Sequence, residues 1–107
     1  MPTLAEIMAA LPERFRPKMA GNLACRVQFD FAESDRPLWE LAIERGECRV
    51  TEGQSAQPDA TVRMEAADFI GINTGEVPAP DLFWSGKIQI EGRVDVVVGL
   101  APIFGWQ

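Results

Sequence analysis

The stretch NLACRVQFDF, residues 22–31, alternates between two kinds of side chain along its whole length. Its odd-numbered positions, from Leu23 to Phe31, are all apolar, and four of its five even-numbered positions, from Asn22 to Asp30, are polar. Strict alternation of this kind is typical of a β-strand with one buried face. A buried face of this length needs a covering layer, so we expect the rest of the chain to supply further strands and the helices that cover them.

Two further strands are predicted downstream, over residues 38–45 and 47–52. The odd-length loop at residues 33–37 keeps odd-numbered positions inward in the first two strands, and a two-residue turn then switches the inward positions to even numbers. Ile43 is therefore expected opposite Cys48. The three strands together predict an antiparallel meander.

Residues 3–15 are predicted to form a helix, because apolar residues recur there at intervals of three and four positions. Thr3 can cap the first turn, with Glu6 as its partner in a capping box. Pro12 lacks the N–H that the helix ladder uses, so we expect the helix to break or kink at this position. Residues 17–21 are then interpreted as a connection.

The second half of the chain contains the remaining elements. Gly75 fits the position that follows the end of a helix. The fold class is therefore α+β, a five-stranded mixed, mainly antiparallel sheet covered by helices. With 107 residues and no linker, the chain is expected to be one domain, residues 1–107. The predicted elements of this half are a strand over 60–64, a helix over 65–74, a short helix or turn over 81–85, a strand over 87–91 and an apolar helix over 94–104.

The charge and the hydropathy of the chain exclude several classes of protein. Sixteen acidic residues against ten basic ones give a net charge of −6. No basic face is available for nucleic acid, and no polybasic segment is available for a membrane anchor. No apolar run approaches the roughly 20 residues of a transmembrane helix. The N-terminus lacks the basic region of a signal peptide, so we expect a cytoplasmic location.

The residue types that many catalytic sites require are missing. The absence of histidine removes histidine-activated nucleophiles and histidine metal ligands. Cys25 and Cys48 are expected as buried thiols about 10 Å apart, two strand spacings, which exceeds the reach of a disulfide. The carboxylates of Glu40 and Glu44 alternate outward and do not form a catalytic pair. We therefore predict no catalytic residue, no metal site and no cofactor.

Residues 59–106 place their elements in a characteristic order. A strand is followed by a helix with the core Asp68-Phe69-Ile70, a turn at Gly75, a short helix, the segment FWSGKIQIEG at residues 83–92 and a terminal apolar helix. This order resembles the sterol-binding domain of the sterol carrier protein family, and a looser match of the first half extends the resemblance over almost the whole chain. Arg93 departs from the family pattern, which often has a helix-capping Asp there, and this puts the start of the last helix in question.

The resemblance implies a lipid-binding or lipid-transfer domain with no catalytic residues of its own. An apolar tunnel between sheet and helices would hold a sterol, a fatty acyl chain or an isoprenoid quinone, under a movable terminal helix. Lys87 and Arg93 flank the last strand and are candidates for contacting a headgroup. The expected tunnel lining is Trp39, Leu41, Phe69, Ile72, Phe83, Trp84, Ile88, Ile90, Val97, Leu100, Ala101 and Phe104.

Two other interpretations stay open. Bulky side chains such as Trp39 and Phe83 could fill the tunnel, which would leave a protein-interaction domain without a ligand. A small acyl-processing enzyme is the weakest interpretation, because acid–base groups are missing.

Trp106 lies near the end of the sequence and is a candidate for contact with a membrane, or with a second copy of the chain through the C-terminal helix. The alternative is that this end is frayed. Because residues 83–106 carry almost no net charge, any membrane contact is expected to be apolar and transient.

Overall fold

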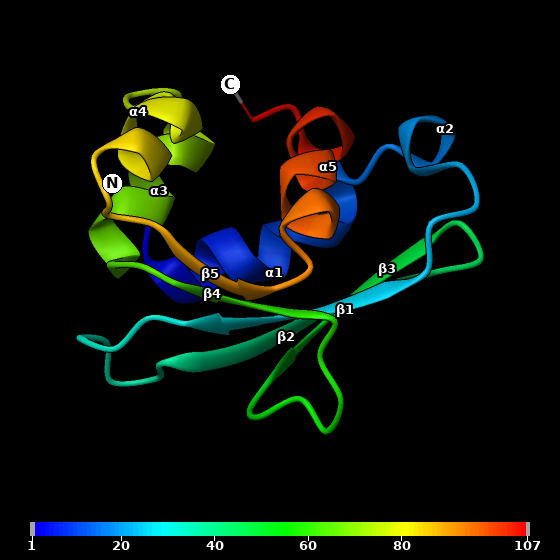
Figure 1. The fold of residues 1–107 in the computed structure, drawn as a ribbon, viewed down its shortest axis with the longest axis horizontal. Helices are drawn as coiled ribbons and strands as arrows, with labels where there is room; N and C mark the ends of the chain where they lie inside the picture. Colours follow the sequence, from blue (N-terminus) through cyan, green and yellow to red (C-terminus); the bar gives the residue numbers. More distant parts are fainter. Residues whose placement is uncertain (1, 107) are drawn as a thin grey trace.

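The computed structural model describes residues 2–106, which form a five-stranded sheet with helices on one face (Figure 1). The strands lie in the spatial order β3-β2-β1-β4-β5. The predicted α+β class is confirmed. In chain order the elements are α1 (Leu4–Arg14), α2 (Pro17–Ala20), β1 (Cys25–Asp30), β2 (Leu38–Glu44), β3 (Glu47–Glu52), β4 (Ala60–Arg63), α3 (Ala66–Thr74), α4 (Ala79–Trp84), β5 (Gln89–Gly92) and α5 (Val94–Phe104).

The sheet is mixed, as predicted. β1 pairs antiparallel with β2, and β2 with β3, and Ile43 lies opposite Cys48 as the turn length requires. β4 lies on the other side of β1 and runs parallel to it, with Val62 beside Phe29. β5 then pairs antiparallel with β4. Because neighbouring residues in register point to the same face, β4 extends the apolar face of the meander.

The first helix, Leu4–Arg14, begins and ends within one residue of the predicted range 3–15. The Thr3 hydroxyl accepts the N–H of Glu6 at 3.2 Å, and the Glu6 carboxylate accepts the N–H of Thr3 at 3.1 Å, so the capping box is present. The expected break at Pro12 is wrong, because α1 continues beyond it. Pro12 lies in the last turn, which the bond from the Phe15 N–H to the Leu11 carbonyl at 3.0 Å still closes.

The connection expected after α1 contains the one-turn helix α2. Pro17 is at its first position, where the missing N–H costs nothing. Just before it, the Arg16 N–H donates to the Ile103 carbonyl at 3.1 Å, and the Arg16 guanidinium donates to the Pro102 carbonyl at 3.4 Å. This segment therefore ties the N-terminal part of the chain to the last turn of α5.

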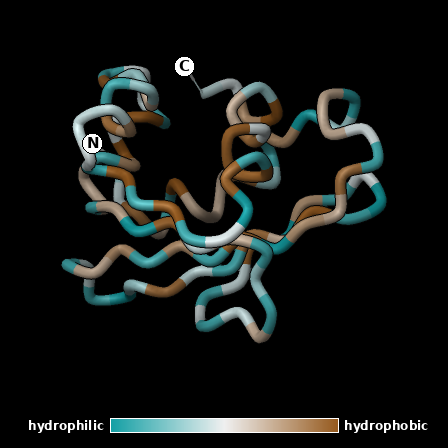
Figure 2. Tube along the Cα trace, in the orientation of Figure 1, coloured by the Kyte–Doolittle hydropathy of each residue, from teal (hydrophilic) through white to brown (hydrophobic). Residues whose placement is uncertain are grey.

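An aromatic core joins the helical layer to the sheet. Phe69 of α3 packs against Phe29 of β1 and against Phe31, which directly follows that strand, with ring centroids 5.2 and 5.3 Å apart. Figure 2 shows brown, hydrophobic stretches along α5 in the helical layer and in the strands. The core thus lies between the helices and the apolar face of the sheet.

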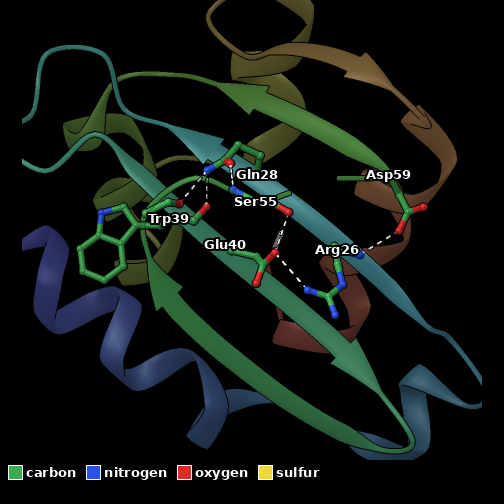
Figure 3. A network of polar contacts seen from close by, with 7 residues as sticks. Arg26, Gln28, Trp39, Glu40, Ser55 and Asp59 are labelled. Atoms are coloured by element: carbon green, nitrogen blue, oxygen red, sulfur yellow. Dashed lines mark hydrogen bonds and ion pairs between the residues drawn. The ribbon is translucent and has the colours of Figure 1, made fainter. Parts of the chain in front are cut away.

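The opposite face of the sheet is covered locally by the loop between β3 and β4 (Figure 3). The alternation places Gln28 on this polar face, where the loop buries it. Its side-chain amide accepts the N–H of Ser55 and donates to the Trp39 carbonyl at 3.0 Å. The Ser55 hydroxyl donates to Glu40 at 2.6 Å, and Arg26 donates to the same carboxylate at 3.3 Å. These bonds hold the loop against the strands.

Candidate functional site

An apolar pocket of about 420 Å³ lies between the β4–β5 half of the sheet and helices α3, α4 and α5. This volume is within the range of roughly 300–1,000 Å³ that is usual for small-molecule sites. Every residue that lines the pocket has an apolar side chain. The lining consists of Phe29, Val62, Met64, Phe69, Ile72, Ala79, Pro80, Phe83, Trp84, Ile88, Ile90, Val97, Val98, Leu100, Ala101 and Trp106.

The local sequence explains why these elements present apolar groups to one space. In the sheet, Val62 and Ile90 face each other across the antiparallel β4–β5 pair. On α5, Val97, Leu100 and Ala101 recur at intervals of three and four positions, so they share one side of the helix. The sheet and α5 therefore supply two facing apolar surfaces of the pocket.

Nine of the twelve predicted tunnel residues line this pocket. The other three lie elsewhere in the core: Trp39 and Leu41 are buried on β2, and Phe104 is buried at the end of α5. β2 is separated from β4 by β1, so its side chains do not reach the pocket. The nine are Phe69, Ile72, Phe83, Trp84, Ile88, Ile90, Val97, Leu100 and Ala101.

Several lining residues were not in the predicted set. Phe29 and Val62 could have been found from the sequence, because both occupy the inward positions of their predicted strands. Ala79 and Pro80 lie at the start of α4, in a segment whose proline content masks its helical character. The complete set of unpredicted lining residues is Phe29, Val62, Met64, Ala79, Pro80, Val98 and Trp106.

Trp106 is not a frayed end, because its half-buried ring packs within the fold; its contact with a membrane or with a second copy stays a prediction. Its ring stacks on Phe104 with centroids 5.0 Å apart and meets Phe69 edge-on at 5.6 Å. Its indole N–H donates to the Asn73 side-chain oxygen at 2.8 Å, and the Arg14 guanidinium donates to the same oxygen at 3.1 Å. Helix α3 thus fixes the ring at the pocket wall.

The pocket opens at its α4–α5 side, where four lining side chains, Pro80 and three larger ones, are also exposed to solvent. The exposed fraction is 82% for Trp84, 62% for Val98 and 37% for Phe83. Lys87, one of the two predicted headgroup contacts, is exposed in the segment between α4 and β5. Charged groups are therefore available outside the opening and not inside it.

Helix α5 begins at Val94, as predicted. The residue before it, Arg93, makes no side-chain capping hydrogen bond. Asp95 in the first turn compensates, because its carboxylate accepts the Arg93 guanidinium at 2.8 Å and lies near the positive end of the helix dipole. The pKa of Asp95 is lowered, chiefly by this hydrogen bond. The predicted bounds of the last helix therefore hold despite the unusual residue before it.

Comparison with known proteins agrees with this architecture. The SCP-2 sterol transfer family matches residues 6–105. The chain belongs to the SCP-2 sterol transfer family. Human sterol carrier protein 2 is 26% identical over 82% of the chain, and the chain spans 16% of the length of that relative.

Two solved structures show the same fold. The palmitated SCP2L2 of Aedes aegypti has a TM-score of 0.74 at 21% identity, with 94% of this chain and 90% of that chain covered. The sec-alkylsulfatase Pisa1 of Pseudomonas sp. has a TM-score of 0.80 at 17% identity, with 98% of this chain and 16% of the enzyme covered. An SCP-2 fold thus occurs both as nearly a whole chain and as a small part of a much larger enzyme.

No titratable side chain belongs to the pocket lining of this SCP-2 domain. Burial raises the pKa of the Cys25 and Cys48 thiols to about 11. Both cysteines are unbridged, and β2 lies between their strands. Across residues 2–106 no group of three His, Cys, Asp or Glu side chains is placed to hold a metal ion. In the same residues, no helix has the length and hydropathy needed to cross a membrane.

Proposed function

We propose that this SCP-2 domain binds a long apolar molecule, in the first place a fatty acyl chain, and carries or presents it without transforming it. The observation that supports this function is the pocket of about 420 Å³ whose lining is apolar throughout. The palmitate carried by the Aedes aegypti structure is of the chemical class that such a lining favours. Sterols and isoprenoid quinones are the other ligands to be tested, and a cytoplasmic location stays a prediction from the sequence.

Ligand affinity in such a pocket comes from the burial of methylene groups. Each buried methylene contributes about 0.8 kcal/mol, which is about a fourfold change in affinity. About ten buried methylenes contribute about 8 kcal/mol, which must offset the loss of freedom on association, about 4–15 kcal/mol. Short fatty acids should therefore bind too weakly to detect, whereas affinity should rise steeply with chain length.

The absence of acidic, basic and nucleophilic side chains from the lining also supports binding without catalysis. A reacting group inside the pocket would meet no acid, base or nucleophile, since all sixteen lining side chains are apolar. The bonded cluster of Gln28, Ser55 and Glu40 lies on the opposite face of the sheet. A carboxylate headgroup would remain at the opening, in the neighbourhood of exposed Lys87.

The test is a pocket-filling variant with a matched control. Val97→Trp places a large ring in the pocket, whereas Met19→Trp places the same ring on exposed α2, outside the lining. Palmitate at a hundredfold excess over its Kd should stabilise the unmodified protein and Met19→Trp by about 2.7 kcal/mol. It should stabilise Val97→Trp by much less.

Calorimetric titration with fatty acids of 8, 12 and 16 carbons and native mass spectrometry of the purified protein complete the test. If no fatty acid, sterol or quinone raises the melting temperature, the lipid-binding proposal fails. The protein-interaction alternative, with the pocket closed by its own side chains, then becomes the better interpretation. Turnover of an acyl thioester by the purified domain would contradict the non-catalytic role.

A further inference from the structure

A patch of exposed apolar side chains surrounds the opening of the pocket. Within residues 2–106, five large apolar side chains are exposed, and four of them lie on α4 and α5: Phe83, Trp84, Val94 and Val98. We call these four residues the rim patch. Val94 and Val98 are one helical turn apart and therefore share a side of α5. The fifth residue, Met19, lies on α2.

The charges beside the rim patch cancel, although the chain as a whole carries −6. Asp95 is paired with Arg93 at 2.8 Å, and Glu91 is paired with Arg63 at 2.7 Å. Asp81 and Lys87 add one charge of each sign. The residues around the rim patch therefore have no excess of basic groups that could bind an anionic surface. Their negative charges are balanced by these positive ones.

The size of the rim patch decides between a second protein chain and a lipid surface. Taking the aromatic side chains at roughly 150–250 Å² each, the four residues expose on the order of 400 Å². A stable dimer buries about 800 Å² on each partner, roughly twice this area. A tryptophan that is 82% exposed, with an apolar ring and a polar N–H, suits the boundary between lipid headgroups and acyl chains.

We propose that the rim patch docks on the surface of an uncharged, zwitterionic lipid bilayer. This inference rests on the proposed function, because Phe83, Trp84 and Val98 belong both to the patch and to the pocket lining. Docking there places the opening against the acyl region, so that a lipid chain moves between bilayer and pocket without crossing water. Anionic lipid gives no advantage, since the protein is acidic overall.

The experiment measures binding to phosphatidylcholine vesicles by flotation, with and without a third of the lipid replaced by anionic phosphatidylglycerol. The variants are Val94→Glu, which changes a rim residue outside the pocket lining, and Trp84→Glu. The control is Met19→Glu, which adds the same charge at an exposed apolar side chain on α2. We expect both rim variants to weaken vesicle binding at least tenfold, the control to bind as the unmodified protein does, and phosphatidylglycerol to give no increase.

A second measurement separates this proposal from the proposed function. Palmitate binding is followed in vesicle-free solution for the unmodified protein and for Val94→Glu, whose palmitate affinity should be unchanged. If palmitate binds but phosphatidylcholine vesicles do not, the docking proposal is overturned and the proposed function stands. If vesicles bind and palmitate does not, the proposed function fails while docking stands.

Two other outcomes also overturn the docking proposal. One is binding that requires phosphatidylglycerol, because the rim would then act through charge. The other is a dimer in solution that Val94→Glu dissociates, because the patch would then be covered by a second copy of the chain.

Discussion

Replacement of Gly92 by alanine should destabilise the domain strongly, and the structure indicates two separate reasons. Gly92 has a φ of +87°, in the left-handed region that side chains with a Cβ rarely adopt. An added Cβ would also lie 2.5 Å from the Asp59 carbonyl oxygen and 3.1 Å from the Cα of Ala60. The neighbours are backbone atoms and cannot rotate away, so β4 and β5 must separate locally.

The two costs can be estimated separately. The left-handed backbone costs about 1–2 kcal/mol for a residue with a Cβ, and overpacking in a place that cannot relax costs about 1–3 kcal/mol. The expected loss is therefore about 2–5 kcal/mol, out of a total stability of about 5–15 kcal/mol for a domain. The Arg93 N–H donates to that same Asp59 carbonyl at 3.0 Å, so the strain reaches the first residues of α5.

Two other glycines provide the matched controls. Gly86 has a φ of +80° but no atom within 4 Å of an added Cβ, so Gly86→Ala should cost only the backbone component, about 1–2 kcal/mol. Gly99 lies inside α5 with a helical backbone, and a Cβ added there would also have no atom within 4 Å. Gly99→Ala should therefore stabilise the domain by up to about 1 kcal/mol.

Urea unfolding, followed by circular dichroism, measures all three free energies. The decisive quantity is the difference between Gly92→Ala and Gly86→Ala. Equal losses for these two variants would refute the steric part of the reasoning, because their φ values are nearly the same. A destabilised Gly99→Ala would contradict the open surroundings of α5.

Three further predictions concern single side chains. Asn73→Leu removes the acceptor of the Trp106 N–H and should lower the free energy of urea unfolding by about 2–3 kcal/mol. The indole fluorescence should shift to the red, and an unchanged spectrum would contradict the anchoring of that ring. The pKa of Glu6 is lowered from 4.5, chiefly by the N–H of the N-cap residue, so its carboxylate stabilises α1 at neutral pH and the benefit is lost as the pH falls through the lowered value. The stability gap between the unmodified protein and Glu6→Gln should therefore close below pH 4.5, and a gap that persists in acid would refute this contribution. A pKa of about 11 in place of 9.0 lowers the thiolate fraction of Cys25 and Cys48 about a hundredfold, so Ellman's reagent at pH 8 should react slowly until the protein is unfolded. Rapid reaction of the native protein would disagree with the burial of Cys25 and the partial burial of Cys48.

The strand register could be predicted because the two-residue period leaves little freedom. Once residues 22–31 alternate, the lengths of the next loop and turn determine that Ile43 faces Cys48, and the structure confirms it. The position of α5 could also be predicted, because its apolar run is long and lies between Gly92 and Gly105. These are local properties of the chain and need no knowledge of what packs against what.

The residues that were misplaced depend on contacts between distant parts of the chain. Trp39 and Leu41 have the same inward pattern as the lining residues, but β1 separates them from β4. Trp106 is held by Asn73, 33 residues earlier in the sequence. Gln28 occupies a polar position and is nevertheless buried, because Ser55 and its loop fold over it. The periodicity of apolar residues along the sequence contains no information on such contacts between distant residues.

The position of the pocket follows from which helices cover which strands of the sheet. α1 packs over the β3 side and its apolar stripe is buried there, whereas β4 and β5 lie beneath α5. Between α3 and α5 the cover consists of the Trp106 ring and of α4, a helix of six residues whose single buried side chain is Leu82. Such a short element cannot fill the space, so Val97 and its neighbours on α5 lack full packing. Atoms that line an unfilled space lose dispersion contacts, and an acyl chain would restore them. The incompletely packed helical layer is therefore the structural reason why this domain should gain stability from a ligand.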